Sequence, residues 1–321
     1  MSEREATRRG VLEGIGATVA TALGGAALAG TATATETWTA VESPTGNTLH
    51  DVEDTTAGAY AVAGGGIVLE RTETGWTKIL GGGPTGNGHS LYGADVTDDG
   101  KRLWFVGSSG AVGEYDVETG VVTDHSAPMD ATNNFNDVAV TGAAGEATVS
   151  VAGDSGKVYS SFENGASGTW EYTTPGSGSA ITAVDFHGRR SGHIVDGNKS
   201  VFATDDGATW EEIGLADANV DFYGVDSDGP DDVWVSGGGG MAFHWNGSTW
   251  TPADTGDAGL RDVEVSDGDD SGYTVGSGGK LYALDGGDWT QAQTPTGQNL
   301  KAVVRGDPAI AVGAGGTILE A

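Results

Sequence analysis

A phrase of seven residues, Val62-Ala63-Gly64-Gly65-Gly66-Ile67-Val68, recurs along the sequence. Its later copies cover residues 106–112, 152–158, 195–201, 235–241, 275–281 and 312–318. Successive copies begin roughly 40 residues apart, a period that fits four short strands with their turns, as in one blade of a β-propeller. The glycine-rich centre of each copy predicts a tight hairpin, because glycine tolerates a positive φ.

Each copy lies within a longer unit of apolar segments, which we letter a to d from the centre of the ring outward. An a segment such as Leu49-His50-Asp51-Val52 precedes the phrase, the phrase itself contains b and c, and a d segment that usually holds a tryptophan follows. Seven units predict an all-β, seven-bladed β-propeller of four-stranded blades. The seventh unit ends at Ala321 without a d segment, so we expect Trp38-Thr39-Ala40-Val41 to complete that blade and close the ring.

The second residue of every a segment occupies one repeated place, which we expect to line a central channel. These residues are His50, Tyr92, Asn136, Thr182, Tyr223, Arg261 and Lys301.

Composition excludes several classes of protein. The 321 residues contain no cysteine, which removes disulfides and thiolate metal sites. With 46 acidic and 15 basic residues, the net charge of −31 disfavours binding to nucleic acid or to anionic lipid. The acidic residues are spread over the whole chain, as in haloarchaeal proteins adapted to molar salt, where repulsion is screened over about 3 Å.

Residues 1–34 form a separate segment. Arg8 and Arg9 precede a weakly apolar run rich in glycine and alanine, and the small residues Ala32-Thr33-Ala34 close it. This pattern resembles a twin-arginine export signal, so we expect cleavage after Ala34 and an extracellular or cell-surface protein; a retained membrane anchor is the alternative. Residues 35–321 then form the propeller domain, without a further segment for membrane insertion.

The stretch Thr204-Asp205-Asp206-Gly207-Ala208-Thr209-Trp210 resembles the Asp-box of sialidase-type (BNR) propellers, with Ala203 in place of the usual serine. The wider unit is similar to the repeat of photosystem II stability/assembly factor-like propellers, and more broadly to WD40/YVTN-like repeats. The resemblance covers residues 37–321. It implies structural roles in the c–d turn: Asp205 binds local backbone N–H groups beside Gly207, and Trp210 packs between blades.

The sequence offers little for catalysis. It lacks the arginine cluster of a sialidase and any serine-hydrolase motif, and its six histidines, which we expect at the surface, lack metal-ligand spacing. We therefore expect no enzyme, no catalytic residue and no cofactor. Acidic loops at 226–232 and 267–270 offer oxygens for Ca²⁺, although without the spacing of an EF-hand. The alternative is a secreted glycoside hydrolase or lyase of sialidase-like type that uses acids such as Asp95 or Asp185.

Loops from each d segment to the next a segment bring amide side chains to the face that carries the glycine hairpins. A polar, weakly charged surface of this kind suits recognition of an extended peptide or a glycan, although asparagine and glycine also simply form turns. The candidate partner-binding residues are Asn47, Asn87, His89, Asn133, Asn134, Gln298 and Asn299. The partner is an unidentified protein or glycan. Asn198 and Asn246 begin glycosylation sequons in expected surface turns.

Overall fold

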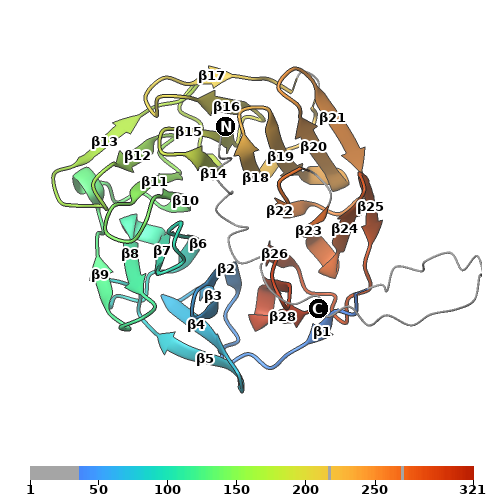
Figure 1. The fold of residues 1–321 in the computed structure, drawn as a ribbon, viewed down its shortest axis with the longest axis horizontal. Coiled ribbons are helices and arrows are strands. Elements are labelled where there is room, and N and C mark those ends of the chain that lie inside the picture. The colour runs from blue at the N-terminus through green and yellow to red at the C-terminus, as the bar shows by residue number, and fades with distance from the viewer. Residues whose placement is uncertain (1–35, 216–217, 269–270) are drawn as a thin grey trace, which may run out of the picture.

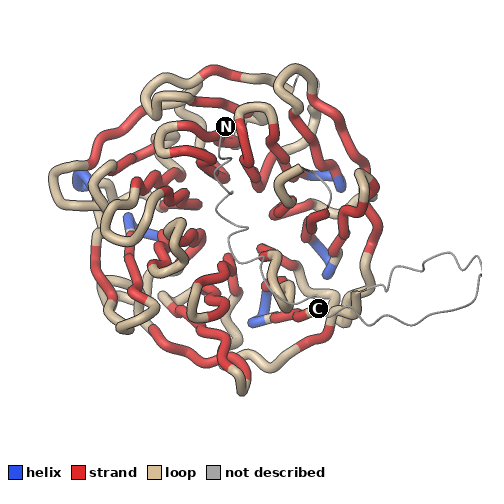
Figure 2. Tube along the Cα trace, in the orientation of Figure 1, coloured by secondary structure: helices blue, strands red, loops and turns tan. Residues whose placement is uncertain are grey.

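The computed structural model describes residues 36–321 apart from 216–217 and 269–270; the expected signal, residues 1–34, lies outside the described residues. The described chain forms seven four-stranded antiparallel sheets that surround a central axis (Figure 1). Strands dominate the ring, and the helices are single short 3-10 turns (Figure 2). The predicted seven-bladed propeller is confirmed.

Blades 1 to 6 are β2–β5, β6–β9, β10–β13, β14–β17, β18–β21 and β22–β25, and blade 7 is β26–β28 with β1. The innermost a strands are β2 (Leu49–Thr55), β6 (Leu91–Val96), β10 (Phe135–Thr141), β14 (Ile181–Gly188), β18 (Phe222–Gly229), β22 (Leu260–Val265) and β26 (Leu300–Val304). The b strands are β3 (Gly58–Ala63), β7 (Arg102–Gly107), β11 (Thr148–Gly153), β15 (Ser191–Asp196), β19 (Asp232–Gly237), β23 (Ser271–Gly276) and β27 (Ile310–Gly313).

The c strands are β4 (Ile67–Thr72), β8 (Val112–Asp116), β12 (Val158–Ser161), β16 (Val201–Thr204), β20 (Met241–Trp245), β24 (Leu281–Asp285) and β28 (Ile318–Glu320). The outer d strands are β5 (Gly75–Leu80), β9 (Val122–Asp124), β13 (Trp170–Thr173), β17 (Glu211–Glu212), β21 (Trp250–Asp254), β25 (Asp288–Gln291) and β1 (Thr39–Ala40). The 3-10 turns are η1 (Ser108–Gly110), η2 (Pro128–Asp130), η3 (Gly238–Gly240), η4 (Ser277–Gly279) and η5 (Ala314–Gly316).

The first and last described strands close the ring. Strand β1 pairs antiparallel with β28, with Thr39 opposite Glu320, and the two lie side by side in Figure 1. Trp38, just before β1, is buried among apolar side chains of blades 6 and 7. The expected closure by Trp38–Val41 is therefore confirmed. Strand β1, from the N-terminal part of the propeller, is thus the outer strand of blade 7, whose other three strands come from the C-terminal end.

The apolar core lies between the blades. Seven clusters of buried side chains each combine residues of two adjacent blades; Leu49 and Leu69 of blade 1, for example, pack with Ile310 and Val312 of blade 7. Since each blade buries its apolar faces only against its neighbours, the stability of any blade depends on the completed ring.

The glycine hairpins between strands b and c pack against the d–a loops. Gly316 has a φ of +75°, and a Cβ atom there would collide with the carbonyl oxygen of Thr45 in the adjacent loop. Gly66 has a φ of +68° and lies equally close to Gly82 and Gly83. Glycine is therefore required here by both backbone conformation and space. We call the face formed by the b–c hairpins and d–a loops the channel face.

Candidate functional site

Every a strand carries a β-bulge at the same place. In all seven blades the register with strand b shifts between the first and third residues of the a strand. A bulge leaves one residue outside the ladder and redirects its side chain. The bulged residues, which we call the bulge ring, are His50, Tyr92, Asn136, Thr182, Tyr223, Arg261 and Lys301. All seven are half-buried and lie where the a strands leave the channel face.

Neighbouring members of the bulge ring contact each other or the next blade. The rings of His50 and Tyr92 meet edge to face at 5.2 Å between centroids. The guanidinium carbon of Arg261 lies 3.9 Å from the centre of the Tyr223 ring, a cation–π contact. These contacts run around the central axis from blade to blade, so the predicted common location of the seven side chains is supported by their geometry.

Two other members bond to backbone across a blade junction. Asn136 Nδ2 donates to the carbonyl oxygen of Ile181 in blade 4 (2.8 Å). Thr182 Oγ1 donates to the carbonyl oxygen of Phe222 in blade 5 (3.1 Å). Asn136 Nδ2 also donates to Asp154 Oδ1 (3.1 Å), so this part of the ring combines uncharged members with an adjacent carboxylate.

Positive charge collects in one arc of the bulge ring. Burial and the neighbouring charge of Arg261 lower the pKa of Lys301. Burial and the charge of Lys301 lower the pKa of His50 to about 4, so His50 is neutral at pH 7. Two adjacent cations, from blades 6 and 7, thus lie beside a neutral imidazole from blade 1.

These two cations have no acidic partner in the part of the chain that the structure describes. The described ion pairs use other cations, such as Arg71 with Glu320 and Arg102 with Asp116. Arg261 and Lys301 take part in no described ion pair or side-chain hydrogen bond, although the chain carries 46 carboxylates. An unpaired, half-buried arginine beside a lysine is unusual in so acidic a protein.

Six aspartates of the a strands, three buried and three half-buried, link the blades. Each such carboxylate accepts a backbone N–H from the a strand of the next blade, over 2.5 to 2.9 Å. The carboxylates are Asp51, Asp137 and Asp262, at the third position of the strand, and Asp95, Asp185 and Asp226, at the fifth. Six of the seven blade junctions contain one. Sequence reasoning missed this role.

The acids considered for a glycosidase belong to this set. Asp95 and Asp185 are 2% and 8% exposed, and each accepts two backbone N–H groups, from its own strand and from the next blade. A glycosidase acid must reach its substrate and keep an oxygen free to exchange a proton. The alternative therefore loses the two residues on which it rested.

The seven candidate partner-binding residues divide into two groups. Asn47, Asn134 and Asn299 hold glycine hairpins: Asn47 Nδ2 donates to Gly64 O (2.7 Å), Ser109 N donates to Asn134 Oδ1 (3.2 Å) and Gly278 N donates to Asn299 Oδ1 (2.9 Å). These three have the turn-forming role left open as the alternative. The side chains of the others make no described intramolecular hydrogen bond, and binding by them stays a prediction. They are Asn87, His89, Asn133 and Gln298.

The Asp-box turn follows the expected path but uses a different aspartate. Asp206, rather than Asp205, accepts the backbone N–H groups of Ala208 and Thr209 (both 2.7 Å), and these bonds lower the pKa of Asp206 to about 2. The alignment to the family motif had assigned this role to Asp205, one residue too early. Asn246 occupies the same distance before its tryptophan and accepts the N–H groups of Ser248 and Thr249 in the same way.

The expected roles of Gly207 and Trp210 agree with the structure. Gly207 has a φ of +71° and donates its N–H to Thr204 Oγ1 (2.9 Å). Trp210 Nε1 donates to Thr173 Oγ1 of the preceding blade (2.9 Å), so the indole packs between blades. The turn is structural and lies on the face opposite the channel face.

The stretch expected as the first acidic loop is mostly strand, since residues 226–229 belong to β18 and 232 to β19; its turn lies on that opposite face, as does the second stretch, which begins after β22. Burial and the negative charges of Asp226 and Asp267 raise the pKa of Asp228 above its usual range. Among the described residues no three acidic or histidine side chains are arranged to hold a metal ion. Asp269 and Asp270 lie outside the described residues, and calcium binding stays a prediction.

One histidine departs from the surface location expected of all six. His193 is 1% exposed, and its Nδ1 lies 2.7 Å from Ser227 Oγ, which also contacts His187 Nδ1 at 2.9 Å. Burial and the nearby His187 lower the pKa of His193 to about 3. Through Ser227 the two histidines of blade 4 are joined to blade 5.

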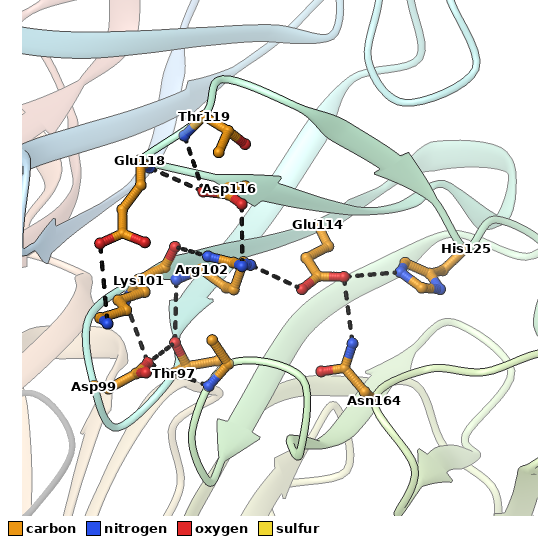
Figure 3. Close-up of polar contacts among 11 residues, drawn as sticks. Thr97, Asp99, Lys101, Arg102, Glu114, Asp116, Glu118, Thr119, His125 and Asn164 are labelled. Carbon is orange, nitrogen blue, oxygen red and sulfur yellow. Dashed lines mark hydrogen bonds and ion pairs between the residues drawn. The ribbon is translucent and has the colours of Figure 1, made fainter.

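A further polar cluster in blade 2 is structural (Figure 3). Glu114 is paired with Arg102 (3.5 Å) and His125 (3.2 Å) and accepts a hydrogen bond from Asn164 of blade 3 (3.4 Å). Arg102 also pairs with Asp116 (3.0 Å). Because charges of both signs lie side by side, the cluster ties blade 2 to a loop of blade 3, although the buried Asn164 Oδ1 has no described hydrogen-bond partner.

An apolar pocket of about 440 Å³ lies where blade 4 meets blade 5, away from the bulge ring. Its lining is apolar apart from Asn219 and the indole N–H of Trp250, which donates to Ile213 O (2.9 Å). The other lining residues are Gly214, Leu215, Ala218, Val220, Met241, Phe243 and Pro252.

The two sequon asparagines, Asn198 and Asn246, are exposed in turns, and their glycosylation stays a prediction. Within the described chain no helix is long and apolar enough to span a membrane.

Fold and bulge ring together define a seven-bladed β-propeller that presents polar side chains around its axis on one face. No protein-family model matches the chain, and no curated protein matches it either. Among solved structures, YCF48 from Cyanidioschyzon merolae is similar with a TM-score of 0.69 and 19% identity, over 88% of this chain and 98% of that one.

A structure of YCF48 bound to D1 peptide has a TM-score of 0.69 and 15% identity, over 88% of this chain and 96% of that one. The WD40 propeller domain of Doa1 has a TM-score of 0.70 and 9% identity, over 88% and 94%. At such identities the likeness shows the shared fold. The expected similarity to photosystem II assembly-factor and WD40-like propellers is therefore confirmed for the fold.

Proposed function

We propose that this chain is an exported, salt-adapted, non-catalytic propeller whose channel face binds an extended segment of a protein partner at the cell surface. One observation carries the proposal: Asn87, Asn133 and Gln298 are exposed on the channel face with side chains that make no described intramolecular hydrogen bond. Amide groups of this kind pair with both the donors and the acceptors of a peptide backbone. The bulge ring adds aromatic and cationic groups at the centre of the same face.

Four further observations support the proposal. A propeller of similar fold has been solved as YCF48 bound to D1 peptide, so the scaffold is compatible with peptide binding. Export rests on the paired Arg8 and Arg9, and salt adaptation on the net charge of −31. Against an enzyme, the carboxylates of Asp95 and Asp185 are engaged by backbone N–H groups.

The test is affinity capture in molar KCl from a cell-surface fraction, using residues 35–321. A triple variant, Asn87→Ala, Asn133→Ala and Gln298→Ala, removes the free amides of the channel face. The matched control, Thr56→Ala, Glu146→Ala and Asp231→Ala, changes three exposed residues in a–b loops of the opposite face.

A protein partner that the control retains and the channel-face variant loses supports the proposal. Loss with both variants, or with neither, contradicts the assignment of the channel face. Capture of polysaccharide alone would replace the protein partner with a glycan. Turnover of a glycan in the same salt would restore the glycosidase alternative.

A further inference from the structure

The bulge ring contains two cations whose donors are unused. The guanidinium carbon of Arg261 lies over the Tyr223 ring, 3.9 Å from its centre, and this cation–π contact uses the charge of the guanidinium without using its N–H groups as hydrogen-bond donors to oxygen. None of them makes a described hydrogen bond. The stacking fixes the side chain, so Arg261 is a pre-organised donor rather than a mobile surface arginine.

Lys301 occupies the bulge position of the blade next to that of Arg261 and is half-buried; burial and the positive charge of Arg261 both lower the pKa of Lys301. Like charges at such a place destabilise the free protein unless an anion offsets them. The 46 carboxylates of the chain include none that forms an ion pair with either cation among the described residues. The nearby carboxylates of Asp51 and Asp262 already accept backbone N–H groups on both oxygens.

The geometry points to a binding subsite: we propose that Arg261 and Lys301 receive a carboxylate of an extended peptide at the centre of the channel face. A planar carboxylate matches the donor fork of arginine, and the lysine ammonium adds a second charge. The inference rests on the proposed function, because the surrounding amides Asn87, Asn133 and Gln298 would hold the adjoining peptide backbone.

The charge of the whole chain restricts the ligand further. A surface of −31 repels a peptide that carries a run of acidic residues. The subsite therefore fits one carboxylate on an otherwise neutral or basic peptide, whether at the C-terminus or on a single acidic side chain. The group that binds is a carboxylate in both cases, and binding measurements distinguish a C-terminal carboxylate from an acidic side chain.

The probes are arrayed random heptapeptides in three forms: free C-terminus without acidic residues, amidated C-terminus without acidic residues, and amidated C-terminus with one central Glu. Binding is measured in molar KCl, where screening over about 3 Å suppresses the general charge of the surface. The peptide bound best is then titrated against each protein by fluorescence polarisation.

The ring variant is Arg261→Gln with Lys301→Gln. Its matched control is Arg190→Gln with Lys78→Gln, which removes the same charge outside the channel face; Arg190 also stacks on an aromatic ring, 3.6 Å from the centroid of Phe162. We expect the ring variant to weaken binding at least about tenfold, as for hydrogen bonds to charged groups, while the control leaves it unchanged. Far-ultraviolet circular dichroism verifies that both variants fold.

A second readout needs no optimised ligand. In protein carrying ¹⁵N-labelled lysine, N-acetyl-triglycine with a free carboxylate should raise the pKa of the Lys301 ammonium, and its amide should not. The same measurement is repeated with the best arrayed peptide at saturating concentration. If neither free acid raises the pKa of Lys301, the inference is overturned.

The outcomes separate the inference from the proposed function. Peptide binding that depends on Asn87, Asn133 and Gln298 but not on Arg261 and Lys301 would overturn the carboxylate subsite and leave the proposed function standing. Equal binding of free-acid, amidated and Glu-containing peptides would do the same. Binding of uronic-acid oligosaccharides in place of every peptide would overturn both.

Discussion

Arg71 in the first blade and Glu320 in the last are joined by two hydrogen bonds of 3.0 Å, from Nε and Nη2 to the two carboxylate oxygens. Trp76 Nε1 donates to the same carboxylate (2.9 Å). The junction between blades 7 and 1 lacks a linking aspartate. In strand β26 of blade 7, the third and fifth positions, where the other a strands carry that aspartate, are Ala302 and Val304. The closing junction of the ring thus uses a side-chain clamp between outer strands instead of an aspartate between inner ones.

Loss of this clamp should destabilise the ring. We expect Glu320→Ala to lower the free energy of unfolding by about 1–3 kcal/mol, since it leaves a half-buried guanidinium and the indole N–H of a buried tryptophan without their acceptor. Chemical denaturation measures the difference. Glu118→Ala is the control, because the exposed Glu118–Lys101 pair spans 3.9 Å and should contribute less than about 1 kcal/mol. Equal effects of the two changes would contradict the clamp.

The inter-blade aspartates should contribute more than surface acids do. Asp95→Ala leaves the buried N–H groups of Val96 and Val140 without an acceptor, and we expect a loss of about 2–4 kcal/mol in unfolding free energy. Asp98→Ala, an exposed acid in the loop that follows the same strand, is the comparison, with an expected loss under about 1 kcal/mol. A wild-type denaturation midpoint for Asp95→Ala would refute the linking role.

Asp205 and Asp206 offer a direct comparison within one turn. Asp206→Ala should lower the melting temperature, because two backbone N–H groups lose their acceptor, whereas Asp205→Ala should leave it nearly unchanged. The low pKa of Asp206 means that its contribution is present above about pH 4 and is lost as pH falls through about 2. Differential scanning calorimetry at pH 7 tests the pair, and the reverse order would restore the assignment to Asp205.

The ring-closing junction should also be sensitive to pH. Burial raises the pKa of Asp54 to about 6, against the opposing charge of Arg71. Because this pKa exceeds the unfolded value of about 4, the contribution of Asp54 is complete below pH 4 and is lost as pH rises through 6. Relative to wild type, Asp54→Asn should therefore gain stability between pH 4 and pH 7, on the order of 1–3 kcal/mol. A constant difference across that range would contradict the raised pKa.

The sequence predicts the number of blades, the order of their strands and the closure by Trp38–Val41 because each follows from a repeated local pattern. The spacing of the apolar residues in each a strand also indicates the bulge. Leu49 and Val52, three positions apart, pack in the same cluster between blades 1 and 7, whereas an unbroken strand of period two would direct them to opposite faces. The same spacing recurs in every a strand, at Leu300 and Val303 for instance.

Other features depend on distances that local pattern does not encode. Asp95 differs from a surface acid only because the a strand of blade 3 passes beside it, and Arg261 differs from Arg71 and Arg102 because it forms no described ion pair. In a chain with 46 acidic residues, the type of residue alone carries little information about such roles. The choice between Asp205 and Asp206 likewise needed the observed turn geometry.

The central claim is that a partner binds the channel face. Hydrogen–deuterium exchange of the full chain, with and without the captured partner, tests it without any substitution. We predict slower exchange in the d–a loops and in the start of the a strands, over residues 44–50, 84–92, 131–136 and 295–301, with the opposite face unchanged. Protection confined to the a–b loops and c–d turns, or to the outer strands, would contradict the claim.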